Sequence, residues 1–400
     1  MNPDRSLPLL GGLTPRAFLR EYWQKKPLLI RGAIPDLVAP LTRGEVLTLA
    51  AREDAESRLV EGRGKKWTLT HGPIGARKFG ELKSKTTPWT VLVQDVQHHS
   101  YEAHDLLAKF GFISNARIDD LMVSYAVDGG GVGPHVDSYD VFLLQGTGKR
   151  KWQISRQGDL SLEAGLPLKI LKRFRVEDEF VLETGDMLYL PPQVAHHGVA
   201  IGDCLTWSIG FRAPNYQELG EFLLDTSRDS FTFPGQYSDP SMKPTRFPGN
   251  VDTQMQRSLL RVMRQVAKSV RNEQHLTHAL GCFLTALKPH VFLPQPDDHW
   301  EQGPFAREVK SRGVRLTLPT RMLRCSGEFF VNGEHLPCPS NVEDALFELA
   351  NSRMLRPASV GQNTTRVRAP FNQTLCRILH QLHETGAIEF APIEHGGKNG

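Results

Sequence analysis

Two stretches about sixty residues apart place the strongest constraint on the fold of this chain. The first, residues 129–152, holds His135 and Asp137 directly after a Gly-rich segment. The second, residues 185–212, contains an apolar run, a Pro-Pro turn and a His pair that begins at His196. Side chains at positions i and i+2 of an extended strand point to the same face, so His135 and Asp137 can converge on one ion. If the two stretches pair within one β-barrel, His196 completes a set of two imidazoles and one carboxylate.

This ligand set has a known chemical meaning. Two histidines and a carboxylate on one face of iron(II) leave the opposite positions open for a cosubstrate and for oxygen. The spacing alone is weak evidence, because it recurs at His299 and Glu301 in a Pro-rich stretch that we interpret as a solvated loop. His135 differs in its setting, since a proline precedes it and glycines at 129, 130, 131 and 133 would let the backbone come close to a bound group.

The residues that follow predict a buried cation. Residues 139–148 read as a strand that ends in a Gly turn, and residues 149–155 read as a further strand that starts with Lys149, Arg150 and Lys151. Alternation along that strand puts Arg150 on the face opposite its two neighbours. A buried guanidinium needs an anion, and one carboxylate of a small dicarboxylic acid would serve. An ordinary basic surface patch remains the alternative.

The whole N-terminal half reads as a β-rich domain. We count eight or more strands and few helices over residues 1–215, which predicts a double-stranded β-helix, or jelly roll, with the metal at its mouth. One strand, residues 117–127, runs into the glycines before His135 and places Ser124 near that mouth. The fold class is therefore mainly β, followed by smaller helical and mixed regions.

The C-terminal half has a different pattern. Residues 216–289 predict amphipathic helices that form a homodimer interface, interrupted at 233–250 by a Pro-rich ordered linker. Residues 290–400 predict a small α+β domain of winged-helix type, with a hairpin turning at Asn332-Gly333. This region lacks an Arg/Lys-rich recognition helix, so direct nucleic-acid binding is not predicted.

The cysteine pattern and the distribution of apolar residues indicate where in the cell the protein is expected. The five cysteines are far apart and never form a C-x-x-C pair, which argues against a disulfide framework and for reduced thiols. The sequence shows neither an apolar run of membrane-spanning length nor the features of a signal peptide at its N-terminus. We expect a cytoplasmic protein that makes no contact with a membrane.

Taken together, residues 18–33, 117–154, 185–198 and 207–215 resemble the bacterial ribosomal oxygenases of the JmjC, cupin-like class. That family consists of iron(II)- and 2-oxoglutarate-dependent dioxygenases, which use O2 to hydroxylate an arginine of ribosomal protein uL16. The resemblance implies the same cofactors, the same reaction and the same ribosomal partner for this chain.

The resemblance also assigns roles to single residues. It implies that His135, Asp137 and His196 are the iron ligands, that Arg150 binds the far carboxylate of 2-oxoglutarate, and that the Ser124 hydroxyl assists there. The neighbouring His197 stays open as the third ligand, although the register after the Pro-Pro turn favours His196. Asp128 and Ser208 are hypothesised to grip the guanidinium of a substrate arginine.

Three other functions remain open at this point. The chain could hydroxylate a histidine of another ribosomal protein, or demethylate lysine with the same metal centre. It could also be a non-catalytic cupin-like binding module.

Overall fold

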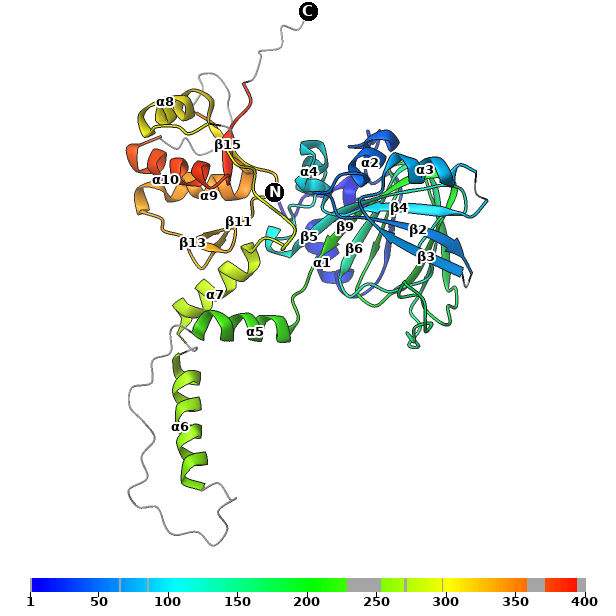
Figure 1. The fold of residues 1–400 in the computed structure, drawn as a ribbon, viewed down its shortest axis with the longest axis horizontal. Coiled ribbons are helices and arrows are strands. Elements are labelled where there is room, and N and C mark those ends of the chain that lie inside the picture. Colours follow the sequence, from blue (N-terminus) through cyan, green and yellow to red (C-terminus); the bar gives the residue numbers. More distant parts are fainter. Residues whose placement is uncertain are drawn as a thin grey trace, which may run out of the picture. The chain divides into compact units, whose positions relative to one another are not determined.

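The structure is a computed structural model that describes residues 2–64, 66–84, 86–228, 253–269, 272–296, 298–357 and 371–393. The chain divides into two compact units, Met1–Ala213 and Pro214–Gly400, which are coloured blue to green and green to red in Figure 1. Within the described residues, no helix is both long enough and apolar enough to cross a membrane.

The N-terminal unit contains four α-helices and nine strands among its described residues. The helices are α1 (Pro15–Glu21), α2 (Arg43–Ala50), α3 (Ala76–Leu82) and α4 (Tyr101–Ala108). The strands are β1 (Leu28–Ile30), β2 (Ser57–Arg63), β3 (Lys66–His71), β4 (Trp89–Val93), β5 (Ile118–Ala126), β6 (Asp140–Ser155), β7 (Asp178–Leu182), β8 (Met187–Leu190) and β9 (Ala195–Phe211).

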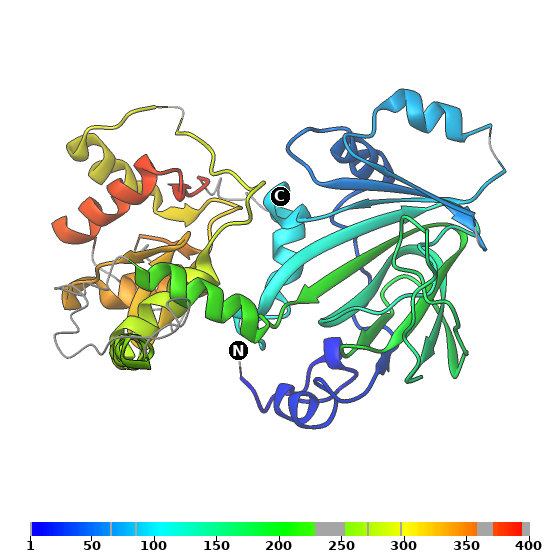
Figure 2. The same ribbon diagram turned by 60° about the horizontal axis from the view of Figure 1, so that its bottom comes forward.

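These strands form one antiparallel sheet in the order β1-β8-β6-β9-β5-β4-β2-β3, with β7 also beside β6. The first half of β6 pairs with β8 and its second half pairs with β7, while β9 follows it on the other side. The sheet thereby folds into two facing layers (Figure 2). The predicted jelly roll is confirmed.

One expectation about β6 was wrong. The sequence predicted a turn at the end of residues 139–148 and a new strand after it, but β6 runs unbroken from Asp140 to Ser155. Register shifts between Gln145 and Lys149 absorb the bend instead, as β-bulges commonly do. Gly148 takes a φ of 66° there, which a residue with a side chain rarely adopts.

An aromatic core holds the helices against the outer face of the sheet. Phe18 of α1 is fully buried, and its ring lies 5.0 Å from Tyr189 and 5.6 Å from Phe142. Helix α1 begins at Pro15, because Thr14 accepts a hydrogen bond from the backbone of Ala17 and Pro15 occupies the first turn. Burying a side chain such as Phe18 stabilises the fold by about 2–3 kcal/mol.

The C-terminal unit is built from helices and two small sheets. Its helices are α5 (Tyr216–Ser227), α6 (Thr253–Ser269), α7 (Glu273–Thr285), α8 (Gln302–Arg312), α9 (Glu343–Ser352) and α10 (Gln373–Glu384). One sheet joins β14 (Met354–Leu355), β10 (Val314–Leu316) and β15 (Ile388–Phe390); the other joins β11 (Met322–Cys325), β12 (Glu328–Val331) and β13 (Glu334–Leu336).

Helix α7 packs on the sheet of β11, β12 and β13. The predicted division of this unit into residues 216–289 and residues 290–400 stays a prediction. The predicted hairpin turn is confirmed, since Asn332 and Gly333 join β12 to β13 with positive φ angles. The winged-helix assignment stays a prediction, and the predicted linker at 233–250 lies outside the described residues.

Candidate metal centre

The register of β6 and β9 decides which side chains face the interior of the barrel. Ile154 lies opposite His196, and Arg150 lies opposite Ala200. Directly opposed residues of an antiparallel pair point to the same face, so Arg150 and His196 share one face. That face is the inner one, because Ile154 belongs to the apolar core between the two layers, together with Leu143 of the facing layer.

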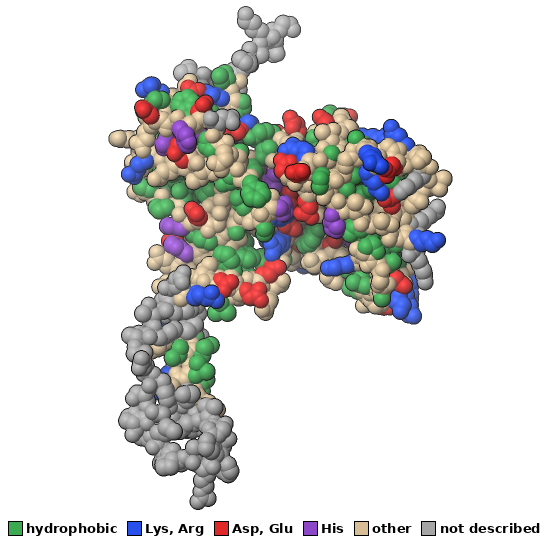
Figure 3. All heavy atoms as spheres, viewed as in Figure 1, with side chains coloured by type: hydrophobic (Ala, Val, Ile, Leu, Met, Phe, Trp, Pro, Cys, Tyr) green, Lys and Arg blue, Asp and Glu red, His purple; other side chains and the backbone are tan. Residues whose placement is uncertain are grey.

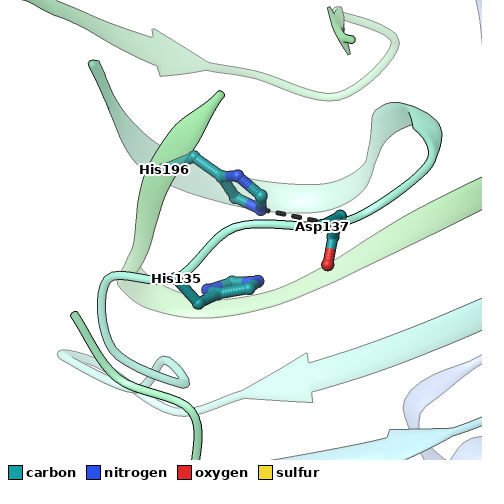
Figure 4. Close-up of side chains that lie close together, drawn as sticks. All are labelled: His135, Asp137 and His196. Atoms are coloured by element: carbon teal, nitrogen blue, oxygen red, sulfur yellow. Dashed lines mark ion pairs between the residues drawn. The ribbon is translucent and has the colours of Figure 1, made fainter. Parts of the chain in front are cut away.

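The three predicted ligands lie close together in this interior. His135 and His196 form an isolated antiparallel bridge, with backbone N–O distances of 3.0 and 2.9 Å and ring centroids 4.2 Å apart. Asp137 Oδ2 lies 3.6 Å from His196 Nε2, and one ligand atom from each residue lies within 4.8 Å of the others. Figure 4 shows the three side chains pointing toward one another. His135 and Asp137 precede β6 rather than belonging to it.

Backbone contacts orient both imidazoles. The Nδ1 atom of His135 lies 3.0 Å from the carbonyl oxygen of Gly133, and that of His196 lies 3.0 Å from the carbonyl of Val194. A carbonyl only accepts, so Nδ1 carries the proton and donates in each ring, which leaves the Nε2 lone pair for a metal. Burial, reinforced by the neighbouring His135, lowers the pKa of His196 to about 4. The imidazole is therefore neutral at pH 7, as a metal ligand must be.

Arg150 is the buried cation that the sequence predicted. Arg150 is only 5% exposed, and its Nε and Nη2 atoms have no hydrogen-bond partner among the residues that the structure describes. Its guanidinium lies 5.7 Å from the ring of Trp152, which cannot neutralise it. A buried guanidinium with two unused donors fits a carboxylate ligand. The donor set and Arg150 together therefore fit a metal and a dicarboxylic acid.

The facing layer supplies the two predicted serines. Ser208 lies opposite Leu143, and Ser124 lies opposite Thr206, so both side chains face the interior. Asp128 is not brought to the cluster. It is exposed, and its Oδ1 accepts a 2.7 Å hydrogen bond from the backbone N–H of Gly202. Its role as a substrate contact stays a prediction.

His197 lies on the other face of β9, and it is therefore not placed to be the third ligand. His197 lies opposite Gln153 of β6, and two residues further along the same face Val199 lies opposite Lys151. These four side chains line a hollow of about 560 Å³ on the outer side of the layer. This hollow is separated from the metal centre by the strands themselves, so we do not assign the centre's chemistry to it.

The glycines before His135 serve a different purpose from the one predicted. A Cβ at Gly131 would lie 2.4 Å from the carbonyl oxygen of Gly198, and one at Gly130 would lie 2.5 Å from that of Trp89. Their missing side chains let the segment pack directly against β4 and β9. The glycines thus bring backbone close to backbone, rather than backbone close to a ligand.

Gly198 makes a testable contribution to the same packing. A Cβ at this position would lie 2.6–2.9 Å from three atoms of the Trp152 ring, which is 5.9 Å from the His196 ring. Gly198→Ala is therefore expected to lower the free energy of unfolding by about 1–3 kcal/mol, as overpacked cores do. Urea denaturation would measure the change. Gly158→Ala is the matched control, because a Cβ there meets no atom within 4 Å; an equal loss in both variants would contradict the steric argument.

Sequence reasoning missed a polar wall beside the cluster. A Cβ built on Gly210 would lie 2.9 Å from Asp120 Oδ1 and 3.2 Å from Tyr139 Cε2, so both side chains cover this glycine. Gly210 opposes Val141 of the interior core, which places the wall inside the barrel. Burial, followed by the nearby charges of Asp137 and Asp120, raises the pKa of Tyr139. The available signal was the position of Tyr139, two residues after Asp137.

The fold and the site together define a class. A jelly roll with a histidine, aspartate, histidine cluster inside is the arrangement expected of a JmjC domain, and the JmjC domain family model matches residues 105–219. The chain is 32% identical to the ribosomal protein uL16 3-hydroxylase of Escherichia coli, over 86% of this chain and 90% of that protein. The chain therefore belongs to the ribosomal oxygenase family.

Two further comparisons agree with this assignment. A probable ribosomal oxygenase of Haemophilus influenzae is 43% identical over 52% of both chains. The solved structure of the E. coli ribosomal oxygenase YcfD in complex with cobalt and 2-oxoglutarate superposes with a TM-score of 0.79 at 29% identity, covering 95% of this chain and 99% of that one.

Proposed function

We propose that this chain is an iron(II)- and 2-oxoglutarate-dependent oxygenase that hydroxylates an arginine side chain of ribosomal protein uL16. One observation carries the proposal. His135, Asp137 and His196 lie close together inside the barrel, and the guanidinium of Arg150 points into the same interior without a hydrogen-bond partner for its Nε and Nη2 atoms among the described residues. The E. coli relative is a ribosomal protein uL16 3-hydroxylase, which supports the choice of substrate.

Each residue of the centre has a defined task. His135 and His196 would bind the metal through Nε2, and Asp137 would bind it through a carboxylate oxygen. When iron(II) is bound, the chemistry supplied here is oxygen activation coupled to the decarboxylation of 2-oxoglutarate to succinate. Arg150 holds the far carboxylate of that cosubstrate, and Ser124 lies on the facing layer of the same interior. The surrounding apolar core excludes water from the reaction.

The polar wall over Gly210 favours a cationic substrate. Asp120 is only 7% exposed, and it lies beside Tyr139, whose hydroxyl is neutral at pH 7 and whose pKa is raised further by burial. A partly desolvated carboxylate attracts a guanidinium strongly, and it gains less from a neutral imidazole. We therefore favour arginine over histidine as the target, with Asp120 replacing Asp128 as the acidic contact and Ser208 on the same face.

Asp120→Asn tests this assignment. Removing one charge while keeping the shape is expected to raise KM for a uL16 peptide by about tenfold or more, because a charge-assisted hydrogen bond contributes roughly 1.5–3 kcal/mol. Slow succinate formation without peptide should stay unchanged, since Asp120 does not contact the cosubstrate in this scheme. The exposed Asp128→Asn is the matched control, and an equal rise in KM there would contradict the role of Asp120.

The reaction itself is tested by mass spectrometry. The purified chain is incubated with iron(II), 2-oxoglutarate and uL16, and the products are followed for succinate and for one added oxygen atom on an arginine. Succinate without a modified arginine would overturn the substrate while leaving the oxygenase class intact. Absence of both products would overturn the proposal as a whole.

We further propose that the protein is cytoplasmic and acts as a homodimer through α6. Leu259, Leu260 and Met263 of this helix are 63%, 56% and 56% exposed, and Figure 3 shows hydrophobic side chains gathered along it. A second copy of the chain would cover this surface, as exposed apolar patches usually require. Light scattering at the monomer mass across the working concentration range would contradict the dimer.

A further inference from the structure

A second group of potential metal ligands lies in the C-terminal unit. His278 of α7, Glu328 of β12 and His335 of β13 each offer one ligand atom, and these atoms lie within 4.8 Å of one another. Glu328 Oε2 is 2.5 Å from His278 Nε2 and 3.3 Å from His335 Nε2, and the two imidazole rings stack with their centroids 4.3 Å apart. The three side chains are about one-third exposed.

The closest of these contacts is not a hydrogen bond. Among the described residues, neither His278 Nε2 nor Glu328 Oε2 has a hydrogen-bond partner, although both atoms are shielded from solvent. Their 2.5 Å separation therefore does not reflect a shared proton. Binding one metal ion would satisfy both atoms, and it would require them to move apart to the separation of two ligands.

The fold brings the three residues together from separate elements. Glu328 and Phe330 alternate onto one face of β12, and His335 is the direct partner of Phe330 on β13. Helix α7 lies on this face, because a Cβ at Gly281 would come within 2.3–2.5 Å of the Phe330 ring. Gly281 therefore permits the close approach that carries His278 to the hairpin.

We propose that His278, Glu328 and His335 form a zinc site with three protein ligands and a solvent molecule in the fourth position. Two imidazoles and one carboxylate suit Zn²⁺ rather than Mg²⁺ or Ca²⁺, which prefer oxygen ligands alone. Ligands at about 2.0–2.2 Å from one ion lie roughly 3.2–3.6 Å apart. Small side-chain rotations that separate Glu328 Oε2 from His278 Nε2 would bring the three ligand atoms to such distances. The ion joins α7 to the β12–β13 hairpin and thereby stabilises the C-terminal unit.

The site is separable from the barrel centre by mutation. The full-length chain is stripped with a chelator, and Zn²⁺ is then titrated while bound metal is counted by equilibrium dialysis with elemental analysis. An Asp137→Ala background removes the barrel site. In that background we expect one bound equivalent, and His278→Ala together with His335→Ala should weaken it at least about 100-fold, more than the loss of an outer-shell partner.

Controls make the outcome decisive. His299→Ala removes an exposed histidine from the same unit and is expected to leave the bound equivalent unchanged. Glu328→Gln preserves shape but removes charge, so it covers the case in which the double variant fails to fold, and it should also weaken binding. Co²⁺ in place of Zn²⁺ should give the intense visible absorption of a four-coordinate ion, and lose it in Glu328→Gln. No bound equivalent in the Asp137→Ala background, or one that Glu328→Gln leaves intact, would overturn the proposal.

Discussion

His196→Ala is expected to abolish the conversion of 2-oxoglutarate to succinate, whereas His197→Ala is expected to retain it. His196 faces the interior with its Nε2 3.6 Å from Asp137, and His197 faces the outer hollow beside Gln153. Removing a direct ligand leaves two protein ligands, and the loss of metal affinity should exceed the roughly 10–100-fold that outer-shell changes cause.

His197→Ala is a close control for His196→Ala because the two histidines are adjacent on β9. Both residues are buried enough that the pKa of each is lowered to about 4, so charge does not distinguish them. Only the face of β9 differs. Iron binding by calorimetry and succinate formation would be measured for both variants, and loss of both properties in His197→Ala with retention in His196→Ala would reverse the ligand assignment.

Arg150→Ala is expected to raise KM for 2-oxoglutarate by about 100-fold or more, because a buried guanidinium paired with a carboxylate contributes roughly 3 kcal/mol. The change in kcat at saturating cosubstrate should be much smaller, since Arg150 binds the end remote from the reacting carbon in the proposed pose. Steady-state kinetics with varied 2-oxoglutarate would measure both constants.

Two variants separate binding from general damage at this position. Arg150→Met keeps much of the volume but removes a buried cation that lacks a partner in the protein, so the unliganded variant should be at least as thermostable as the parent chain. Lys151→Met alters the neighbouring residue, which faces the outer hollow and pairs with Glu179. An equal rise in KM for Lys151→Met would contradict the assignment of faces.

The parts of the structure that the sequence predicted are those that depend on local periodicity. Alternation along the strand placed Arg150 inside. The Asn332-Gly333 turn followed from its demand for positive φ. Each of these features depends on residues that are neighbours in the sequence, so it could be predicted without knowing which distant segments lie beside it.

Contacts made by distant segments could not be predicted from the sequence. The carboxylate of Asp128 accepts a hydrogen bond from Gly202 on β9, a contact that no local pattern indicates. The wall of Asp120 and Tyr139 exists because Gly210, from a third segment, leaves room for both. The glycines at 146 and 148 indicate a bend in the chain. Whether that bend is a turn or a β-bulge within one strand depends on the pairing with β9, which the sequence does not show.

The continuity of β6 and β9 has a mechanical consequence. β6 carries Arg150 and also reaches the facing layer at Leu143, while β9 carries His196 and continues to Ser208 and Gly210. One proposed metal ligand, the proposed cosubstrate contact and one proposed substrate contact thus lie on two continuous strands that pair with each other along most of their length. A distortion of either strand at one of these residues is therefore expected to shift the others as well.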